Sequence, residues 1–255
     1  MATYFISDLH LTSDQGEVSR LFYEFLRNAS SDADGVYILG DLFEFWIGDD
    51  AVEQVGQSEA VSAIRALTRS GTPVYFMRGN RDFLVGAGFE ETTGCRILPD
   101  PSRIEIDGQK IILMHGDSMC TDDTAHQQFR ALVNNAEWRK EFLALPVDRR
   151  IELALSARTE SALHKSVSSM EIMDVNQGAV ENELKQHDAE ILIHGHTHRP
   201  GIHTLQLDGR RATRIVLGDW NAHNSVLRYE SGIFRLSANG SDFPAVRLKS
   251  TIAPI

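Results

Sequence analysis

The chain has 255 residues, with 36 acidic side chains against 25 lysines and arginines, and a formal net charge of -11 at pH 7. Because nucleic-acid binding depends on clustered Lys and Arg that neutralise phosphates, this balance argues against a nucleic-acid-binding protein. The only cysteines, Cys95 and Cys120, lack the spacing of a disulfide framework or a thiolate metal site, which predicts a reducing compartment.

Neither a secretory signal nor a membrane span is expected. The first apolar run is four residues long and ends at Asp8, with no basic segment before it. No run approaches the ~18 apolar residues that a span requires. We therefore expect a cytosolic protein, or one attached only to a membrane surface.

Five short apolar runs that end in polar side chains organise the chain. Their β-branched and aromatic residues, punctuated by glycine, are typical of buried strands. They are residues 4–10, 36–41, 74–80, 111–117 and 191–198. Because functional groups in α/β sheets gather beyond the carboxyl ends of the strands, we expect the five polar ends to converge.

The converging side chains carry carboxylate, amide and imidazole groups. They are Asp8, His10, Asp41, Asn80, His115, His196 and His198. Ligands of these types without thiolate suit manganese, iron or zinc in an open, reactive site. Seven ligands are too many for one ion, so we predict two divalent ions bridged by Asp41. Alone, any one of these residues would more often be a cap or a hydrogen-bonding group; their joint placement favours metal.

The segments between these strands alternate with them. Apolar side chains at helical spacing predict an amphipathic helix over residues 16–29 and a second helix over 52–67, closed by Gly71 before Pro73. This order is βαβαβ.

Three short turns predict antiparallel hairpins as well. They are Asp107-Gly108, Asp208-Gly209 and Ser231-Gly232, each between alternating apolar runs. We therefore predict an α/β fold with two mixed sheets that face each other and are flanked by helices.

Between residues 122 and 187 the strand signal disappears and good helix formers dominate. We predict a helical cap over 122–187, inserted into a sandwich made of 1–121 and 188–255. Pro146 interrupts the cap, and Asp174 is the predicted N-cap of its last helix.

One part of the cap, residues 138–155, interleaves apolar side chains with Arg139, Lys140, Arg149 and Arg150. Two interpretations stay open. The segment either packs on neighbouring helices, or forms a basic amphipathic surface that rests on an anionic membrane.

Several polar residues beside the predicted strand ends have other interpretations. We expect His194 to pack or to support a ligand. Asp49 and Asp50 could orient ligands, but capping of a helix is favoured for both. Arg81 is interpreted as a phosphate-binding group, whereas Arg199 fits a phosphate or a salt bridge equally well. Asp82 is expected to orient ligands, and Asp117 and Asp219 receive no role.

The ordered blocks resemble the calcineurin-like metallophosphoesterases, whose pattern is D-x-H, G-D, G-N-H-(D/E), a lone His and G-H-x-H. Here they are Asp8-Leu9-His10, Gly40-Asp41, Gly79-Asn80, His115 and Gly195-His196-Thr197-His198. The resemblance implies a four-layer αββα sandwich with an inserted helical cap. It also implies that Asp8, His10, Asp41 and His198 hold one ion, and Asp41, Asn80, His115 and His196 the other.

One departure from that pattern bears on the reaction. Arg81 stands where the family usually has the histidine that protonates a poor leaving group. A phosphate monoester, with a second pKa of about 6, leaves without a proton at neutral pH. The departure therefore favours cleavage of a pyrophosphate.

Longer strings narrow the resemblance to the UDP-2,3-diacylglucosamine pyrophosphatases of lipid A biosynthesis. They are ISDLHL, GDLFEFWIGDD, GNRDF, MHGDSMCTDD, IMDVNQ and HGHTHRP. The resemblance implies that water attacks the α-phosphorus and releases UMP and 2,3-diacylglucosamine 1-phosphate. It further implies manganese, a cap that holds the acyl chains, and peripheral attachment to the cytoplasmic side of the inner membrane. We expect a monomer.

The same resemblance assigns functional residues. It gives Asn80, Arg81 and His196 catalytic and substrate-binding roles, and places Asp123, Arg158 and Ser161 at substrate contacts. Where the family often has Asn and then Lys, this sequence has Lys165 and Ser168, so the lysine contact is expected one turn away.

Two other functions stay open at this point. The chain could hydrolyse soluble nucleotide pyrophosphates, or it could be a binding scaffold with the same fold and no catalysis. The apolar cap favours a lipid substrate over the first, and the seven filled ligand positions argue against the second.

Overall fold

The predicted strands at 4–10, 36–41 and 74–80 form the parallel centre of an eight-stranded sheet in the computed structural model, which describes residues 1–14, 16–167 and 172–248. The strand order is β12-β11-β10-β1-β2-β3-β4, with β13 paired to β11. The bounds are β1 (Ala2–Ile6), β2 (Ala33–Leu39), β3 (Val74–Met77), β4 (Arg96–Leu98), β10 (Val226–Glu230), β11 (Ile233–Ala238), β12 (Ser241–Asp242) and β13 (Val246–Arg247). Because β10 pairs antiparallel to β1, the sheet is mixed.

The other two predicted strands lie side by side in a second mixed sheet, of order β5-β6-β7-β9-β8. Its bounds are β5 (Ser102–Ile106), β6 (Gln109–Met114), β7 (Ile191–His194), β8 (Gly201–Leu207) and β9 (Arg210–Val216). All three predicted hairpins are confirmed. In each, both turn residues have positive φ, for example 49° at Asp107 and 76° at Gly108, which matches the twist of the flanking strands.

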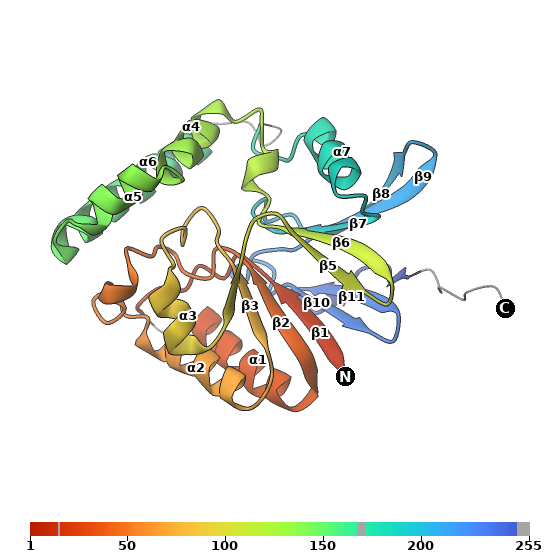
Figure 1. Ribbon diagram of the computed structural model, residues 1–255, viewed down its shortest axis with the longest axis horizontal. Coiled ribbons are helices and arrows are strands. Elements are labelled where there is room, and N and C mark those ends of the chain that lie inside the picture. Colours follow the sequence, from red (N-terminus) through yellow and green to blue (C-terminus); the bar gives the residue numbers. More distant parts are fainter. Residues whose placement is uncertain (15, 168–171, 249–255) are drawn as a thin grey trace.

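Helices cover the outer face of each sheet (Figure 1). They are α1 (Glu17–Asp32), α2 (Ser58–Arg69) and α3 (Ala87–Thr93) on the eight-stranded sheet, and α7 (Gln177–Gln186) on the five-stranded one. Successive strand residues point to opposite faces, so Ile6 packs with the helical layer while Phe5 packs between the sheets. The predicted four-layer αββα sandwich is confirmed.

The second predicted helix begins later than expected. Residues 49–51 form the short 3-10 helix η1 (Asp49–Ala51), and α2 starts only at Ser58. Gly56 has φ of 70°, which ends any helical path from η1 into α2. Val52 and Val55 pack on the core from this turn.

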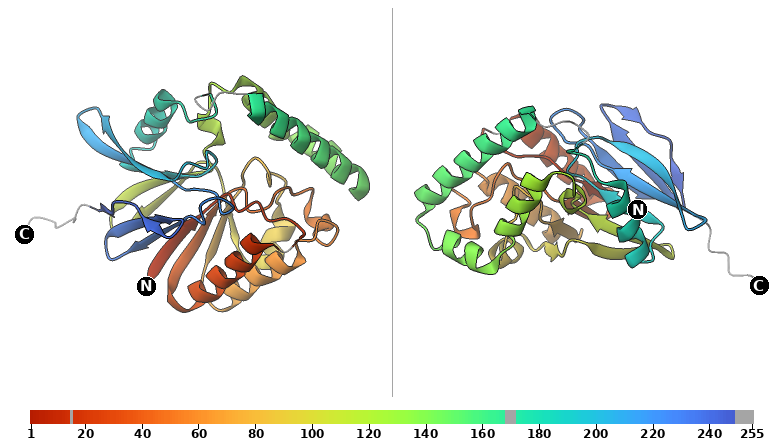
Figure 2. Two further views of the ribbon diagram at one scale, coloured as in Figure 1. Left: turned by 180° about the vertical axis from the view of Figure 1, so that it is seen from behind. Right: turned by 90° about the horizontal axis from the view of Figure 1, so that it is seen from above.

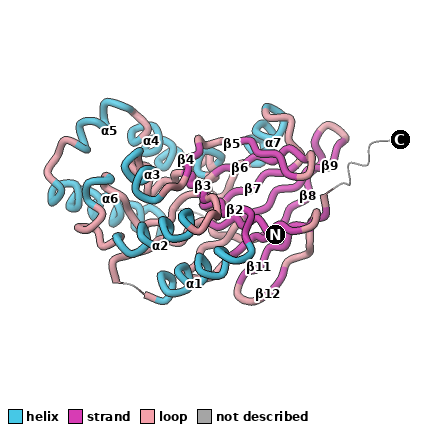
Figure 3. Tube along the Cα trace, turned by 60° about the horizontal axis from the view of Figure 1, so that its bottom comes forward, coloured by secondary structure: helices cyan, strands magenta, loops and turns pink. Residues whose placement is uncertain are grey.

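The remaining helices are η2 (Asp117–Met119), α4 (Thr124–Val133), α5 (Ala136–Leu143) and α6 (Val147–Val167). The last three lie beyond the carboxyl ends of β1, β2 and β3, as seen from behind and above in Figure 2, and Figure 3 shows helices gathered at this end of the molecule. The break at Pro146 is confirmed. No helix in the described part of the chain is long and apolar enough to cross a bilayer. The proposed domain boundaries stay a prediction.

The predicted cap of α7 is wrong by two residues. Asn176, not Asp174, precedes the helix and accepts hydrogen bonds from the backbone N–H groups of Gly178 and Ala179. Asp174 pairs with Arg199 instead, at 2.7 Å.

The segment 138–155 packs inward with much of its apolar surface. Three of its side chains pack into the hydrophobic core that lies between the eight-stranded sheet and α1–α3. They are Trp138, Ile151 and Phe142, which is 9% exposed. Arg150 is buried, donating to the Ile47 carbonyl and the Asp50 carboxylate. These side chains follow the interpretation in which the helices pack on their neighbours.

Candidate metal centre and adjoining cavity

The chain leaves its central strands in an unusual conformation. Five of the seven predicted ligands have φ between 51° and 65°: Asp8, His10, Asp41, His196 and His198. Non-glycine residues adopt this left-handed region rarely, and a cluster of them marks a site where the backbone is held in place for function. Backbone bonds from Asp8 N to Gly40 O (3.1 Å) and from His10 N to Asp41 O (3.0 Å) fix the first two strand ends against each other.

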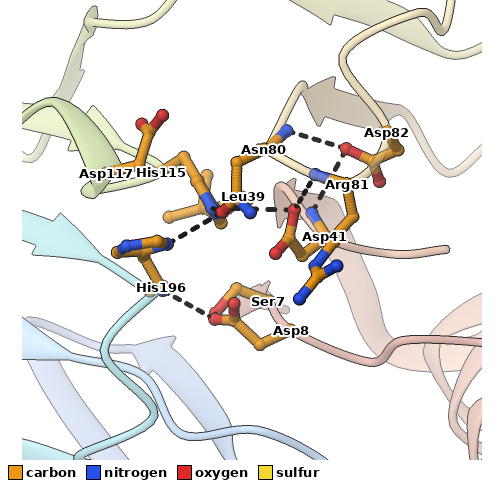
Figure 4. Close-up of polar contacts among 12 residues, drawn as sticks. Ser7, Asp8, Leu39, Asp41, Asn80, Arg81, Asp82, His115, Asp117 and His196 are labelled. Carbon is orange, nitrogen blue, oxygen red and sulfur yellow. Dashed lines mark hydrogen bonds and ion pairs between the residues drawn. The ribbon is translucent and has the colours of Figure 1, made fainter. Parts of the chain in front are cut away.

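All seven predicted ligands come together at this edge. They form two groups, Asp8 with His10 and His198, and Asp41 with His115 and His196, whose donor atoms lie within 4.8 Å of one another inside each group. The seventh, Asn80, joins the second group, with its Oδ1 3.1 Å from His115 Nε2 and 2.9 Å from His196 Nδ1. Figure 4 shows side chains from both groups pointing into one shared space.

This donor set fits a divalent cation. Asp8 is fully buried and Asp41 is 2% exposed, so both carboxylates lie out of water. Asp8 Oδ1 and His10 Nδ1 are buried and have only long ionic contacts, to His198 Nε2 at 3.4 Å and to Glu44 Oε2 at 3.5 Å, an arrangement that costs free energy unless another group binds them. Nitrogen and oxygen donors without thiolate are those of a hydrolytic metal site.

The shifted pKa values of the site also favour the binding of a cation. Burial opposes a charged His115, yet the carboxylates of Asp41 and Asp8 outweigh it and raise the pKa of His115 to about 10. Burial likewise opposes ionisation of Asp8, but the hydrogen bond and charge of His198 outweigh it and lower the pKa of Asp8. The protein part of the site therefore carries negative charge that a cation would neutralise.

A hydrogen bond orients the imidazole of His115 so that Nε2 faces the site. Its Nδ1 lies 2.9 Å from the Leu39 carbonyl, which accepts the ring proton and leaves Nε2 facing Asn80 and Asp41. Proteins commonly set the tautomer of a metal-binding imidazole by a hydrogen bond from the ring nitrogen that does not bind the metal.

The loops of the site are held by Asp82, as expected for a residue that orients ligands. Fully buried, it accepts hydrogen bonds from the backbone N–H groups of Asp41, Leu42, Phe43 and Gly79, between 2.7 and 3.4 Å. Burial, reinforced by the charge of Asp41, raises the pKa of Asp82 to about 7.

Glycines let these loops approach. A Cβ on Gly79 would overlap the carboxylate of Asp41, and one on Gly195 would overlap Asp8 and Ser7. The glycines in the two motifs are thus required by space.

The other polar residues beside the strand ends have structural partners. His194 is fully buried, with Nδ1 2.9 Å from the Gly195 carbonyl, and is in neither group. Asp50 pairs with Arg150, Asp117 with Arg130 at 2.9 Å, and Asp219 accepts from the backbone N–H of Ala222. Asp49 accepts hydrogen bonds from Trp46 Nε1 and Gly86 N.

The residues assigned to substrate binding lie partly at the centre. The Arg81 backbone N–H donates to Asp41 Oδ1 at 2.8 Å, and its guanidinium donates to Ser161 on α6 at 3.3 Å. Asp123 caps α4 through His126 N at 3.0 Å. The Lys165 side chain and all of Ser168 lie outside the described residues. Arg199, paired with Asp174, follows the salt-bridge interpretation.

Glu44 is a functional candidate that the sequence patterns do not reveal. It is mostly buried and joins the metal centre to the cap, with Oε2 3.5 Å from His10 Nδ1 and Oε1 2.8 Å from Arg158 Nε. The same Oε1 lies 4.0 Å from Arg81. The only sequence signal is an acid three residues after Asp41, which is too common to single out.

An apolar cavity of about 760 Å³ opens beside these residues. Asn80, Arg81 and Glu44 line its end at the metal centre. Farther along, the walls are aromatic and aliphatic side chains of the sandwich and of α4–α6, including Trp46, Phe83, Phe129, Trp138, Phe142 and Leu153. Its size and lining are those of a site for an apolar ligand with a few polar anchors.

Comparison with known proteins adds independent findings. The family model described as calcineurin-like phosphoesterase matches residues 1–200. The UDP-2,3-diacylglucosamine hydrolase of Stenotrophomonas maltophilia (strain K279a) is 46% identical over 239 residues, which cover 91% of this chain and 96% of the relative. The protein of that name from Xanthomonas axonopodis pv. citri (strain 306) is 48% identical over 238 residues, with the same coverage.

A solved structure supports the fold. A dimetal phosphatase from Danio rerio superposes with a TM-score of 0.54 at 13% identity, covering 98% of this chain and 99% of its own. At this identity the likeness bears on the fold alone.

Proposed function

Since this chain belongs to the calcineurin-like phosphoesterase family, we propose that it is a metal-dependent hydrolase that cleaves the pyrophosphate bond of UDP-2,3-diacylglucosamine in lipid A biosynthesis. The products are UMP and 2,3-diacylglucosamine 1-phosphate. The observation that carries this proposal is that Asn80, whose Oδ1 lies beside His115 and His196 of one donor group, also lines the large apolar cavity. A substrate that joins a pyrophosphate to two acyl chains matches both parts.

The two donor groups supply the ligands. By the family resemblance, Asp8, His10, Asp41 and His198 would hold one ion, and Asp41, Asn80, His115 and His196 would hold the other. Manganese is proposed from the family resemblance, and the carboxylate, amide and imidazole donors are compatible with it. When bound, the ions provide a nucleophilic water at neutral pH and neutralise charge on the phosphoryl oxygens.

The chain's own groups bind and orient the reacting phosphate. Arg81 is held beside Asp41 by its backbone, and its guanidinium offers forked donors to phosphoryl oxygens, where it stabilises the developing charge. Asn80 and His196 face the same space. Arginine does not release a proton near pH 7, so Arg81 suits a leaving group that departs as an anion, as a sugar 1-phosphate does.

The cap, 122–187, carries substrate specificity on the sandwich formed by 1–121 and 188–255. The acyl chains occupy the apolar cavity, and Arg158 and Ser161, which line it, contact the polar part of the lipid product. Asp123, which caps α4, is proposed as a further contact from the resemblance alone. Lys165 and Ser168 are proposed as further contacts from the resemblance alone.

The protein is proposed to act as a monomer on the cytoplasmic side of the inner membrane. Both metal groups and the apolar cavity are built from one chain. Leu143 and Leu163 on the cap are 41% and 64% exposed, and such leucines favour contact with a lipid surface from which the substrate is drawn.

Product analysis tests the proposal. Purified protein with Mn²⁺ is assayed on UDP-2,3-diacylglucosamine and on UDP-N-acetylglucosamine in 18O-water. We expect the diacyl substrate to react far faster, with the label in UMP, because water attacks the α-phosphorus. Equal rates on both substrates would support a hydrolase of soluble nucleotide pyrophosphates, label in the sugar phosphate would refute attack at the α-phosphorus, and no turnover on either would favour a non-catalytic scaffold.

A further inference from the structure

A second cavity, of about 690 Å³, borders the metal centre at His10. It shares Glu44 and Arg158 with the apolar cavity, so their ion pair stands where the two cavities meet. Its other walls come from the segment that runs from β1 into α1 and from the loops around residues 220–224 and 239–240. A ligand that reaches from one cavity into the other therefore passes the metal centre.

The lining of the second cavity differs from that of the first. Its floor includes buried Leu11 and Trp220, which are 2% and 3% exposed. Its rim carries the exposed side-chain amides of Asn221, Asn224 and Asn239, which form no hydrogen bonds within the described part of the chain. An amide offers both a donor and an acceptor, which suits a ligand whose edge alternates carbonyl and N–H groups.

The charged side chains that line the second cavity further limit the chemical class of its ligand. Asp14, Glu17 and Glu44 line the cavity, and Arg158 is the one Lys or Arg among its described lining residues. An additional phosphate or carboxylate would be repelled. Carboxylates do accept hydrogen bonds from ribose hydroxyls, as they do in dinucleotide-binding folds. A neutral, hydroxyl-bearing group fits this lining.

We propose that the second cavity binds the nucleoside half of the substrate, with the pyrimidine base against the rim amides and the ribose hydroxyls against the carboxylates. This inference rests on the proposed function. A substrate cleaved at its pyrophosphate has a lipid half and a nucleoside half on the two sides of the metal centre. The apolar cavity matches only the lipid half, and the second cavity is the polar volume that continues from the same point.

Two rim variants test this inference without disturbing the metal donors. Asn221→Ala removes one amide. Asn224 has φ of 43°, so Asn224→Gly removes the second amide while keeping a residue that adopts this conformation without strain. Asn28→Ala, at an exposed position of α1 outside both cavities, is the matched control. Thermal unfolding checks that each variant is folded.

The measurement is titration calorimetry of UMP and of inorganic phosphate, with Mn²⁺ present. Each rim variant is expected to weaken UMP binding by about three- to tenfold, the effect of one neutral hydrogen bond, and to leave phosphate binding unchanged. The control should bind both like the wild type.

An unchanged UMP affinity in a variant that carries both Asn221→Ala and Asn224→Gly would overturn the inference. Equal losses for UMP and phosphate would overturn it as well, because they would place the effect at the metal centre. Absence of UMP binding to the wild type would overturn it too. Binding is read without turnover, so a protein that fails to hydrolyse the lipid substrate refutes the proposed function separately.

Discussion

The metal-binding edge of the sandwich and the helices α4–α6 are built in opposite ways. At the edge, seven side chains from five strand ends meet, each of them buried or half-buried, and five of the seven residues have left-handed backbone conformations. Backbone hydrogen bonds hold the first two strand ends together. The helices reach the same place through a few polar contacts, such as Arg158 with Glu44 and Arg150 with Asp50, and through apolar side chains around a cavity. The rigid edge suits the chemistry, whereas the helices suit the choice of substrate.

The largest loss of activity is expected from a change at the metal-binding edge. Asp41→Ala removes the carboxylate that both groups are proposed to share. We expect kcat/KM on the lipid substrate to fall by at least about a thousandfold, because metal ions supply several kcal/mol of transition-state stabilisation. Bound manganese per chain, measured on the purified variant, should fall in parallel. Asp34→Asn, at an exposed carboxylate, is the control; an active Asp41→Ala protein would contradict the metal mechanism.

Glu44 joins the two regions and should give an intermediate effect. Glu44→Gln keeps the shape but loses the charge that faces His10 and Arg158. Groups that orient metal-binding imidazoles typically contribute about 10- to 100-fold in metal affinity or activity, and we expect a loss in that range. Manganese affinity and KM should both change. A variant with unaltered manganese affinity would show that Glu44 acts only through its contact with Arg158 and does not orient His10.

A change in the helical region should alter substrate choice and leave the metal alone. Leu153 lines the apolar cavity, whereas Leu155, two residues on in α6, lies outside it and is 46% exposed. Leu153→Ala is expected to lower kcat/KM for the diacyl substrate in detergent micelles by about 10- to 200-fold, the effect of about 1–3 kcal/mol of lost apolar contact. Leu155→Ala should be close to wild type. Equal losses of kcat/KM in the two variants would show that the acyl chains do not bind in this cavity.

The smallest effect on activity is expected where the cap docks. Asp50→Asn removes the charge that faces buried Arg150 and should lower the free energy of unfolding by about 0.5–1 kcal/mol at pH 7, because the Asp50 side chain is 61% exposed and solvent screens the pair. The hydrogen bond from Arg150 lowers the pKa of Asp50. This stabilisation is therefore present above the unfolded pKa of about 3.9 and is lost as pH falls through the lower, folded pKa. Urea unfolding at pH 7 and pH 3 should show the difference between variant and wild type shrinking in acid.

The sequence predicts the edge well because its signals are local. Each ligand directly follows an apolar run, so placing the runs in one sheet system is enough to bring the ligands together. The hairpins were predictable for the same reason, since Asp107-Gly108 and its two counterparts specify turns with positive φ.

What the sequence does not reveal depends on contacts between distant segments. Glu44 becomes a candidate only when His10 and Arg158 arrive beside it. The cap of α7 shows the same limit: Asp174 and Asn176 are both good capping residues, and Arg199, from another part of the chain, pairs with Asp174 while Asn176 caps the helix.

One measurement tests the central claim most directly. Protein stripped with a chelator is titrated with Mn²⁺ while bound metal per chain and turnover of UDP-2,3-diacylglucosamine are followed together. We predict no turnover in the stripped protein and full activity as two ions per chain are bound. Full turnover in the presence of the chelator would contradict the proposal that this edge of the sandwich acts through a pair of metal ions.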